Sequence, residues 1–191
     1  MPTYSPPFHQ VPILETERLR LRSYQSADFP AYLAMMDDPA VYRYLTPGPP
    51  SEEESYTRIL RMVGHWALRG FGFWAVEEKA SGQFIGVLGF IEVMRQIEPS
   101  LKGYPEIGWV LAAPAHGKGY ATEGVTAALA WADAHFGPTR MVCLMDPENV
   151  ASRRVAEKFG FREFARTTYH GEPALLLERL PGGDDAPPVG K

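Results

Sequence analysis

Segments with the periodicity of strands alternate with segments with the periodicity of helices along most of this chain, and this alternation restricts the fold more than any other feature. Strands are predicted, from alternating or continuously apolar residues, at 18–22, 73–76, 84–93, 106–111, 141–145, 161–166 and 174–180. Helices are predicted, from apolar residues three and four positions apart, at 29–36, from 52 to near 70, after the turn 116–121 as far as 136, and at 149–159. This order predicts a mixed α/β fold with a central sheet of about seven strands and about four helices.

Local signals mark the start of the first two helices. Asp28 is interpreted as the N-cap of the first helix, because its carboxylate can accept hydrogen bonds from the free N–H groups of the first turn. Ser51 and Glu54 have the spacing of a capping box, which begins the second helix. That helix is predicted to bury one apolar face, made up of Tyr56, Ile59, Leu60, Val63 and Trp66.

The distribution of proline marks the boundaries of the folded part. Ten of the 18 prolines lie in the two ends of the chain and in one loop, at 2, 6, 7, 12, 47, 49, 50, 181, 187 and 188. We therefore predict an extended N-terminal arm over 1–12, a single domain over 13–180 and a disordered tail over 181–191. A chain of 191 residues leaves little room for a second domain.

Composition excludes several classes of protein. The formal net charge is −4, whereas a nucleic-acid binder needs a basic face. The apolar runs are shorter than the roughly 20 residues of a membrane-spanning helix, and the first residues lack the pattern of a signal peptide. Cys143 is the single cysteine and the five histidines share no metal-ligand spacing, so we expect no disulfide framework and no metal site. These observations predict a soluble cytoplasmic protein.

The turn HGKGYATE, at 116–123, is the strongest chemical signal in the sequence. It stands between a predicted strand and a predicted helix, whose N-terminus carries unpaired N–H groups and a partial positive charge. Gly117 and Gly119 flank Lys118, and glycine lets the backbone approach an anion closely, so the turn predicts a phosphate site. A plain turn that uses glycine for its geometry is the alternative. The Rossmann and P-loop patterns both fail here, at Thr122 and at Gly119 respectively.

Three motifs in this order resemble the GNAT family of acyl-CoA N-acyltransferases. The turn resembles the family's (Gln/Arg)-x-x-Gly-x-(Gly/Ala) signature, with His116 where Gln or Arg is usual. NVASRRVAEKFGF, at 149–161, resembles its Asn-x-x-Ser/Ala…Gly-Phe helix, and LETERLRLR, at 14–22, resembles the first strand of the RimJ and RimL branch. The resemblance covers nearly the whole predicted domain. It implies the GNAT fold, in which the mixed sheet is splayed between its fourth and fifth strands, here 106–111 and 141–145.

The same resemblance implies acetyl-CoA as the cosubstrate, lying in that splay. Backbone N–H groups of the turn would hold its pyrophosphate, and the end of the strand before the turn would pair with its pantetheine arm. One backbone N–H of that strand end would polarise the thioester carbonyl. The implied cofactor-binding residues are Val110, Leu111, His116, Gly117, Lys118, Gly119, Tyr120, Ala121, Asn149 and Ser152.

Two residues are candidates for the chemistry. Glu106 resembles the acid that often acts as base in this family, usually through water; Glu92 is the rival base, and a solvated acid at a strand end is the structural alternative. Ser152 lies one helical turn after Asn149. In the RimL-like branch that this sequence resembles, a serine at this position is proposed to protonate the leaving thiolate. Ala156 stands where many relatives carry a tyrosine for that step. Helix packing for Ser152 and an ordinary N-cap for Asn149 are their structural alternatives.

These inferences predict an N-acetyltransferase that transfers an acetyl group from acetyl-CoA to a primary amine by direct attack in a ternary complex. The amine would belong to a peptide or protein N-terminus or to a small molecule. A non-catalytic acyl-CoA sensor is the alternative, and a nucleotide-binding enzyme is a third hypothesis. The acceptor is expected to be recognised by the segments 41–50, 94–103 and 168–172. The N-terminal arm and the last strand could each pair with another chain, so a monomer and a homodimer both stay open.

Overall fold

The computed structural model describes residues 10–182, and these residues form two compact units. Unit 1 comprises 10–91 and 109–128, and unit 2 comprises 92–108 and 129–182. The chain changes unit within strand β5 (Glu106–Leu111) and within helix α4 (Tyr120–Phe136), so these two elements contribute residues to both.

Unit 1 is built on antiparallel strands with apolar residues facing its core. β1 (Leu14–Glu15), β2 (Leu19–Arg22), β3 (Phe73–Glu78) and β4 (Gln83–Ile91) pair in chain order, each antiparallel to the next. The fully buried side chains in these strands include Leu19, Leu21, Trp74, Val76, Val87 and Leu88. The Ala112 N–H donates to the carbonyl of Ile85 at 2.9 Å, so the end of β5 lies beside β4.

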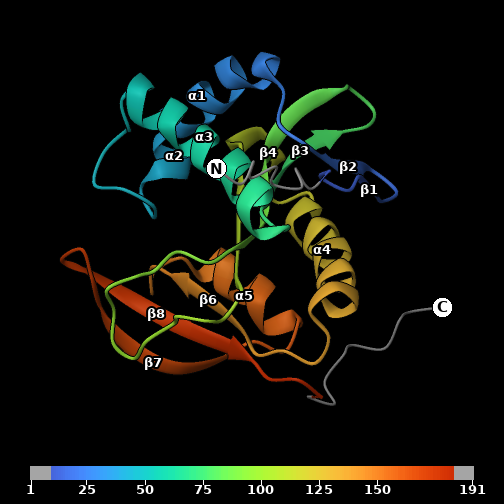
Figure 1. Cartoon of the computed structure of the whole chain (residues 1–191). Coiled ribbons are helices and arrows are strands. Elements are labelled where there is room, and N and C mark those ends of the chain that lie inside the picture. The colour runs from blue at the N-terminus through green and yellow to red at the C-terminus, as the bar shows by residue number, and fades with distance from the viewer. Residues whose placement is uncertain (1–9, 183–191) are drawn as a thin grey trace, which may run out of the picture. The chain divides into compact units, whose positions relative to one another are not determined.

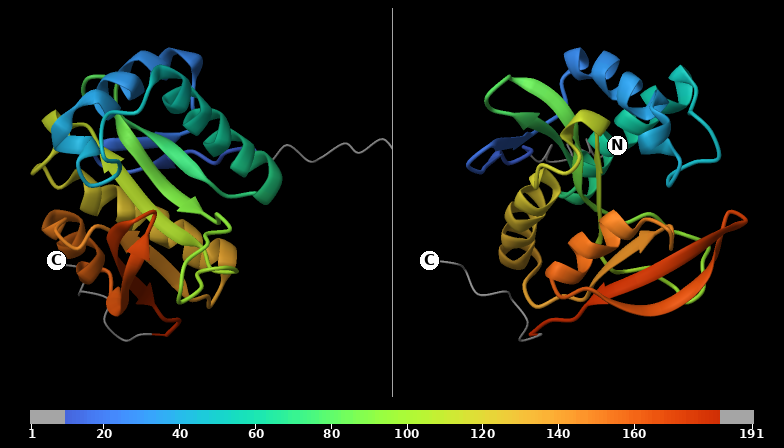
Figure 2. Two further views of the ribbon diagram at one scale, coloured as in Figure 1. Left: turned by 90° about the vertical axis from the view of Figure 1, so that its left-hand side faces the viewer. Right: turned by 180° about the vertical axis from the view of Figure 1, so that it is seen from behind.

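The helices of unit 1 lie on two sides of its sheet. α1 (Phe29–Asp37), α2 (Pro39–Tyr42) and α3 (Glu52–Arg69) lie together on one side of β4, and the first half of α4 lies on the other (Figure 1, Figure 2). The predicted capping box at the start of α3 is confirmed. The Glu54 N–H donates to the Ser51 hydroxyl at 3.2 Å, and the Ser51 N–H donates to the Glu54 carboxylate at 2.8 Å.

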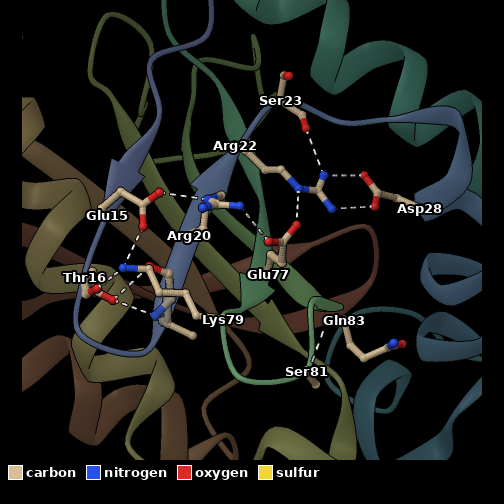
Figure 3. A network of polar contacts seen from close by, with 11 residues as sticks. Glu15, Thr16, Arg20, Arg22, Ser23, Asp28, Glu77, Lys79, Ser81 and Gln83 are labelled. Carbon is tan, nitrogen blue, oxygen red and sulfur yellow. Dashed lines mark hydrogen bonds and ion pairs between the residues drawn. The ribbon is translucent and has the colours of Figure 1, made fainter.

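Asp28 occupies the N-cap position of α1 as predicted, but its carboxylate does not make the expected capping hydrogen bond. It is 5% exposed and accepts two hydrogen bonds from the Arg22 guanidinium, each 2.8 Å long. Figure 3 shows Arg22 held between Asp28 and Glu77. An arginine that is almost buried needs paired carboxylates, and Pro30 in the first turn of α1 has no N–H that requires a cap. The ion pair therefore takes the carboxylate.

The apolar face predicted for α3 is buried only in part. Ile59 and Trp66 are buried, but Tyr56, Leu60 and Val63 are 52%, 53% and 46% exposed. The buried line of the helix runs through Ser55, Ile59 and Trp66, and so is narrower than the predicted stripe. Tyr56 makes an edge contact with the Phe29 ring, at 5.3 Å between ring centroids, but stays half exposed among residues 10–182.

Unit 2 contains a second group of strands and one complete helix. β8 (Glu172–Arg179) pairs antiparallel with both β6 (Met141–Met145) and β7 (Arg162–Tyr169), and the turn between β7 and β8 lies at His170-Gly171. The N-terminal end of β5 runs parallel to β6, with Glu106 opposite Val142. Helix α5 (Val150–Lys158) packs against β6.

The segment 92–105, which includes the proposed acceptor segment 94–103, is irregular but anchored by apolar side chains. Ile97 and Leu101 are 6% and 4% exposed and join a core cluster with Val142 and Leu176. The segment therefore covers part of the strands of unit 2 instead of extending into solvent. This anchoring fixes Arg95, whose role is described below.

The predicted fold class is confirmed, with small differences in the number of elements. Within residues 10–182 there are eight strands and five α-helices; the two-residue β1 and the single-turn α2 are the additions. Both are too short to show a periodicity in the sequence. The parts of the predicted arm and tail at 1–9 and 183–191 lie outside the described residues. In the described part, no helix is both long and apolar enough to cross a membrane.

Candidate functional site

The glycine-rich turn lies in unit 1, between the end of β5 and the start of α4, as predicted. A short 3-10 helix, Ala113–Ala115, follows β5, and α4 begins at Tyr120. Gly117 and Gly119 have φ of 73° and 82°, in the left-handed region that favours glycine. The His116 ring folds back toward β5, with Nε2 2.8 Å from the carbonyl oxygen of Leu111. The turn thus has a defined conformation set by its glycines and by His116.

This turn has the geometry of an anion site. The first backbone hydrogen bond of α4 is donated by the Glu123 N–H to the carbonyl of Gly119, at 3.0 Å. The N–H groups that precede it in the helix have no partner one turn earlier, and they carry the positive end of the helix dipole. A methyl group built on Gly117 would meet nothing within 4 Å, so there is open space beside the turn. A phosphate or pyrophosphate group fits such a site.

A pair of charged side chains, which we call the Arg18–Glu123 brace, fixes the turn to the start of β2. Arg18 donates from Nε to Glu123 at 2.6 Å and from Nη1 to the carbonyl of Lys118 at 2.9 Å. The Arg18 guanidinium also lies 4.6 Å from the centre of the Tyr120 ring. Glu123 accepts further hydrogen bonds from the Thr16 hydroxyl at 2.6 Å and the Arg18 N–H at 2.8 Å.

The brace controls the charge of Glu123 as well as its position. Burial alone would raise the pKa of this carboxyl group, but the hydrogen bonds from Thr16 and Arg18 outweigh that effect and hold the pKa below its ordinary value. Glu123 is therefore ionised over the neutral range and keeps Arg18 directed at the turn.

Val110 and Leu111 lie at the end of β5, directly before the turn. β4 can approach them closely because residue 86 is glycine: a methyl group there would lie 2.3 Å from the Val110 carbonyl oxygen and 2.6 Å from the Leu111 side chain. Gly86 therefore fixes the place of this strand end in unit 1.

Glu106 lies in unit 2 and is bound to an arginine. It is 8% exposed, and both of its carboxylate oxygens accept hydrogen bonds from Arg95, at 2.7 and 2.6 Å. The Tyr169 ring lies 4.9 Å from the same guanidinium. Burial opposes the charge of Arg95, but its bonds to Glu106 more than compensate, so the pKa of Arg95 is raised. Glu106 is thus a buried, oriented carboxylate and not a solvated acid at a strand end. The rival Glu92 accepts a hydrogen bond from the Gly103 N–H at 3.2 Å.

Asn149 and Ser152 begin helix α5 in unit 2. Asn149 acts as the N-cap, with its side-chain oxygen accepting a hydrogen bond from the Ser152 N–H at 3.1 Å. That bond uses the backbone of Ser152. Its hydroxyl group has no partner among residues 10–182, so it is available to a ligand.

The predicted site residues therefore fall into two groups. Val110, Leu111 and the turn 116–121 belong to unit 1, and Glu106, Asn149 and Ser152 belong to unit 2. Within the described chain, no group of His, Cys, Asp or Glu has the arrangement of a metal site. Burial raises the pKa of the Cys143 thiol, so that thiol is protonated and unreactive at neutral pH.

Sequence reasoning missed four residues that hold these groups in place: Arg18, Gly86, Arg95 and Glu123. Arg18 and Glu123 lie inside motifs that had been singled out, but their pairing across 105 positions has no local signal. Gly86 carries a weak signal, since a glycine inside a strand often marks a close backbone approach. Arg95 carries none, because it lies in an irregular segment.

The comparisons with known proteins agree with this geometry. Residues 18–162 match the family model described as an acetyltransferase (GNAT) domain. The uncharacterized protein YkkB of Bacillus subtilis is 32% identical over 171 residues, which cover 87% of this chain and 94% of that protein. The solved structure of an acetyltransferase from Agrobacterium tumefaciens is 27% identical, with a TM-score of 0.76, and the match covers 89% of this chain and 95% of that one.

A more distant structure extends the likeness of the fold. RimL, a ribosomal L7/L12 alpha-N-protein acetyltransferase solved in complex with coenzyme A, matches with a TM-score of 0.69 at 20% identity, over 92% of this chain and 99% of its own. At that identity the likeness concerns the fold alone. The family model and the Bacillus relative together establish that this chain belongs to the GNAT acetyltransferase family and is an acyl-CoA N-acyltransferase.

Proposed function

We propose that this protein transfers the acetyl group of acetyl-CoA to a primary amine, by direct attack of the amine in a ternary complex. The observation that carries the proposal is the braced turn, in which Gly117 and Gly119 open the N-terminus of α4 to an anion. Its N–H groups suit the pyrophosphate of CoA, and Lys118 adds a mobile cation. Val110 and Leu111, directly before the turn, are suited to pair with the pantetheine arm, and a backbone N–H there would stabilise the oxyanion.

The chemistry proposed for unit 2 is proton transfer. The amine nitrogen forms a bond to the thioester carbon, the carbon–sulfur bond breaks, and the amine gives up a proton. Glu106 would take that proton through a water molecule. Arg95 uses one lone pair on each oxygen of Glu106 and leaves the others for water. The unpartnered hydroxyl of Ser152 would donate a hydrogen bond to the departing thiolate.

For the acceptor we propose a peptide or protein N-terminus, as in the RimJ and RimL branch, with a small-molecule amine as the other member of the same chemical class. The support is the motif LETERLRLR at 14–22, which supplies Arg18 to the brace. The fold of RimL is similar, and that protein acts on the N-terminus of a ribosomal protein.

Two measurements test the proposal. Thiol release from acetyl-CoA should depend on the acceptor across a panel of N-terminal peptides and small amines.

CoA should also raise the melting temperature, since a ligand at 100 times its Kd stabilises by about 2.7 kcal/mol. Gly119→Val should abolish that shift, because valine strongly disfavours a φ of 82°. No shift with millimolar CoA would reject the CoA site, and a shift without thiol release from any acceptor would favour the sensor.

A further inference from the structure

Two of the segments expected to recognise the acceptor each place a side chain next to Glu106. Arg95 lies in the segment 94–103 and donates from Nε and Nη2 to the two carboxylate oxygens of Glu106, at 2.7 and 2.6 Å. Tyr169, the last residue of β7, lies in the segment 168–172, and its ring centre is 4.9 Å from the Arg95 guanidinium. All three residues belong to unit 2. The two segments therefore meet at the proposed base.

The contact with Arg95 fixes the direction of the Glu106 carboxylate. The two side chains are only 19% and 11% exposed, so water competes little for their hydrogen bonds. A guanidinium is planar, and two parallel N–H···O bonds from it hold the plane of a carboxylate as well as its distance. One lone pair on each oxygen is used, and the directions of the remaining ones are thereby set. Because a general base needs a free lone pair within reach of the proton or of a bridging water, Arg95 determines where that water can bind.

Arg95 is itself held by contacts with the core of unit 2. Ile97 and Leu101 anchor its segment in the core cluster, and Tyr169 packs against the same cluster. The cation–π contact favours a guanidinium that stays beside the Tyr169 ring. Tyr169 thus limits the movement of Arg95, and through it that of Glu106. Nε and Nη2 of Arg95 are committed to the carboxylate and are not available to an acceptor.

A second arginine in unit 2 has similar surroundings but a different partner. The Arg140 guanidinium lies 4.4 Å from the centre of the Tyr104 ring and pairs with Glu178 at 2.7 Å. Its side chain is 24% exposed, close to the value for Arg95. Tyr104 packs against the same core cluster as Tyr169. Because Glu178 has no proposed part in the chemistry, Arg140 and Tyr104 are matched controls for a purely structural effect.

We propose that Arg95 and Tyr169 are positioning residues for the base of the reaction. Arg95 orients the Glu106 carboxylate, and Tyr169 holds Arg95 in the place where it does so. The inference rests on the role proposed above for Glu106. It separates these two residues from the acceptor recognition expected of their segments, and it predicts that they act on the rate of proton transfer. No bond to either residue forms or breaks in the reaction.

Steady-state kinetics on the full chain distinguish positioning from recognition, with the acceptor of the panel that releases thiol fastest. Arg95→Gln should lower kcat by as much as about 10²-fold, the scale of a misplacement of roughly 1 Å, and leave the KM values for acceptor and acetyl-CoA unchanged. Tyr169→Leu should lower kcat by a smaller factor. Arg95→Lys should recover part of kcat, since an ammonium keeps the charge but does not hold both oxygens in one plane. A raised KM for the acceptor at constant kcat would make these recognition residues and overturn the proposal.

The matched variants test a purely structural explanation. Arg140→Gln and Tyr104→Leu should lower the melting temperature about as much as Arg95→Gln and Tyr169→Leu do, because each removes an arginine or a ring from a similar contact. They should nevertheless leave kcat intact. If kcat falls in all four variants in proportion to the melting temperature, the effect is one of stability and the proposal fails.

A double-mutant cycle with Glu106→Gln shows whether Arg95 acts through the base. Arg95→Gln should cause no further fall in kcat in the Glu106→Gln background, because no carboxylate is left to orient. Independent losses from the two changes would overturn the positioning role and leave the role of Glu106 standing. Full activity of Glu106→Gln alone would instead remove the base from the proposed function, and the positioning role with it.

Discussion

Glu106 is both the proposed proton acceptor and the partner of a partly buried arginine, and a substitution there should separate the two roles. Glu106→Gln should lower kcat/KM by roughly 10²- to 10⁴-fold below the pKa of the acceptor amine, where a proton must be removed. The loss should shrink as the pH rises and free amine accumulates. Rates measured across pH, with acetyl-CoA saturating, would give this profile.

The same substitution has a structural consequence that needs its own control. Replacing a charged partner of Arg95 weakens a hydrogen-bonded ion pair, at a cost of about 1–3 kcal/mol. Glu178→Gln is the matched variant, because Glu178 pairs with Arg140 at 2.7 Å in the same unit and has no proposed role in the chemistry. If both variants melt earlier and neither loses activity at any pH, Glu106 is a structural anchor and the search for a base returns to Glu92 or water.

A substitution at Ser152 should distinguish a role in the transition state from a role in binding acetyl-CoA. Ser152→Ala keeps the backbone bond to Asn149, so α5 should stay capped. Loss of one hydrogen bond to the leaving thiolate should lower kcat about two- to tenfold, with the KM for acetyl-CoA unchanged. Such a pattern marks an interaction made in the transition state. Steady-state kinetics would decide, and a raised KM at constant kcat would instead make Ser152 a binding residue.

Among the elements, the turn before α4 depends on strand β2 for its shape. Arg18→Ala should raise the KM for acetyl-CoA about tenfold, equivalent to about 1.4 kcal/mol, with kcat retained, because the brace holds a binding surface and not the reacting atoms. Arg18→Lys should recover part of the loss, since a lysine cannot reach Glu123 and the Lys118 carbonyl together.

A neighbour on β2 provides the control for the brace. The side chains of Arg18 and Arg20 are 43% and 45% exposed, but Arg20 pairs with Glu15 and Glu77 instead of the turn. Arg20→Ala should therefore leave the KM for acetyl-CoA unchanged. Equal effects of the two alanine variants on KM would show that general loss of charge on β2, and not the brace, is responsible.

Elements whose signals are local could be predicted from the sequence, and those that depend on distant partners could not. The capping box of α3 and the turn that opens α4 are set by residues within a few positions of one another, and both were predicted. Asp28 also has the local pattern of an N-cap, but its carboxylate accepts hydrogen bonds from the nearly buried Arg22 instead of from the first turn of α1. The brace and the Arg95–Glu106 pair bring together segments that no short-range pattern connects.

At the scale of the whole molecule, ion pairs and hydrogen bonds to carboxylates make the stability of the fold depend on pH in the acid range. The pKa of five carboxyl groups is held below its ordinary value of 4.5 by hydrogen bonds and nearby cations: Glu15, Glu54, Glu78, Glu123 and Glu163. A lowered pKa in the folded state gives stability that is complete above the ordinary value and is lost as the pH falls through the lowered one. The melting temperature should therefore be steady near neutral pH and fall below about pH 4.5.

The brace ties this acid dependence to binding of the cosubstrate. Protonation of Glu123 removes the charge that directs Arg18 at the turn, so affinity for CoA should decline over the same acid range as the melting temperature. In Glu123→Gln, affinity should already be low at neutral pH and should vary less with acid. Glu17→Gln is the control, since Glu17 precedes Arg18 in the chain but makes no ion pair within residues 10–182. Calorimetric titration of CoA at several pH values would test this coupling. Equal acid dependence of CoA affinity in the two variants would mean that another group controls the turn.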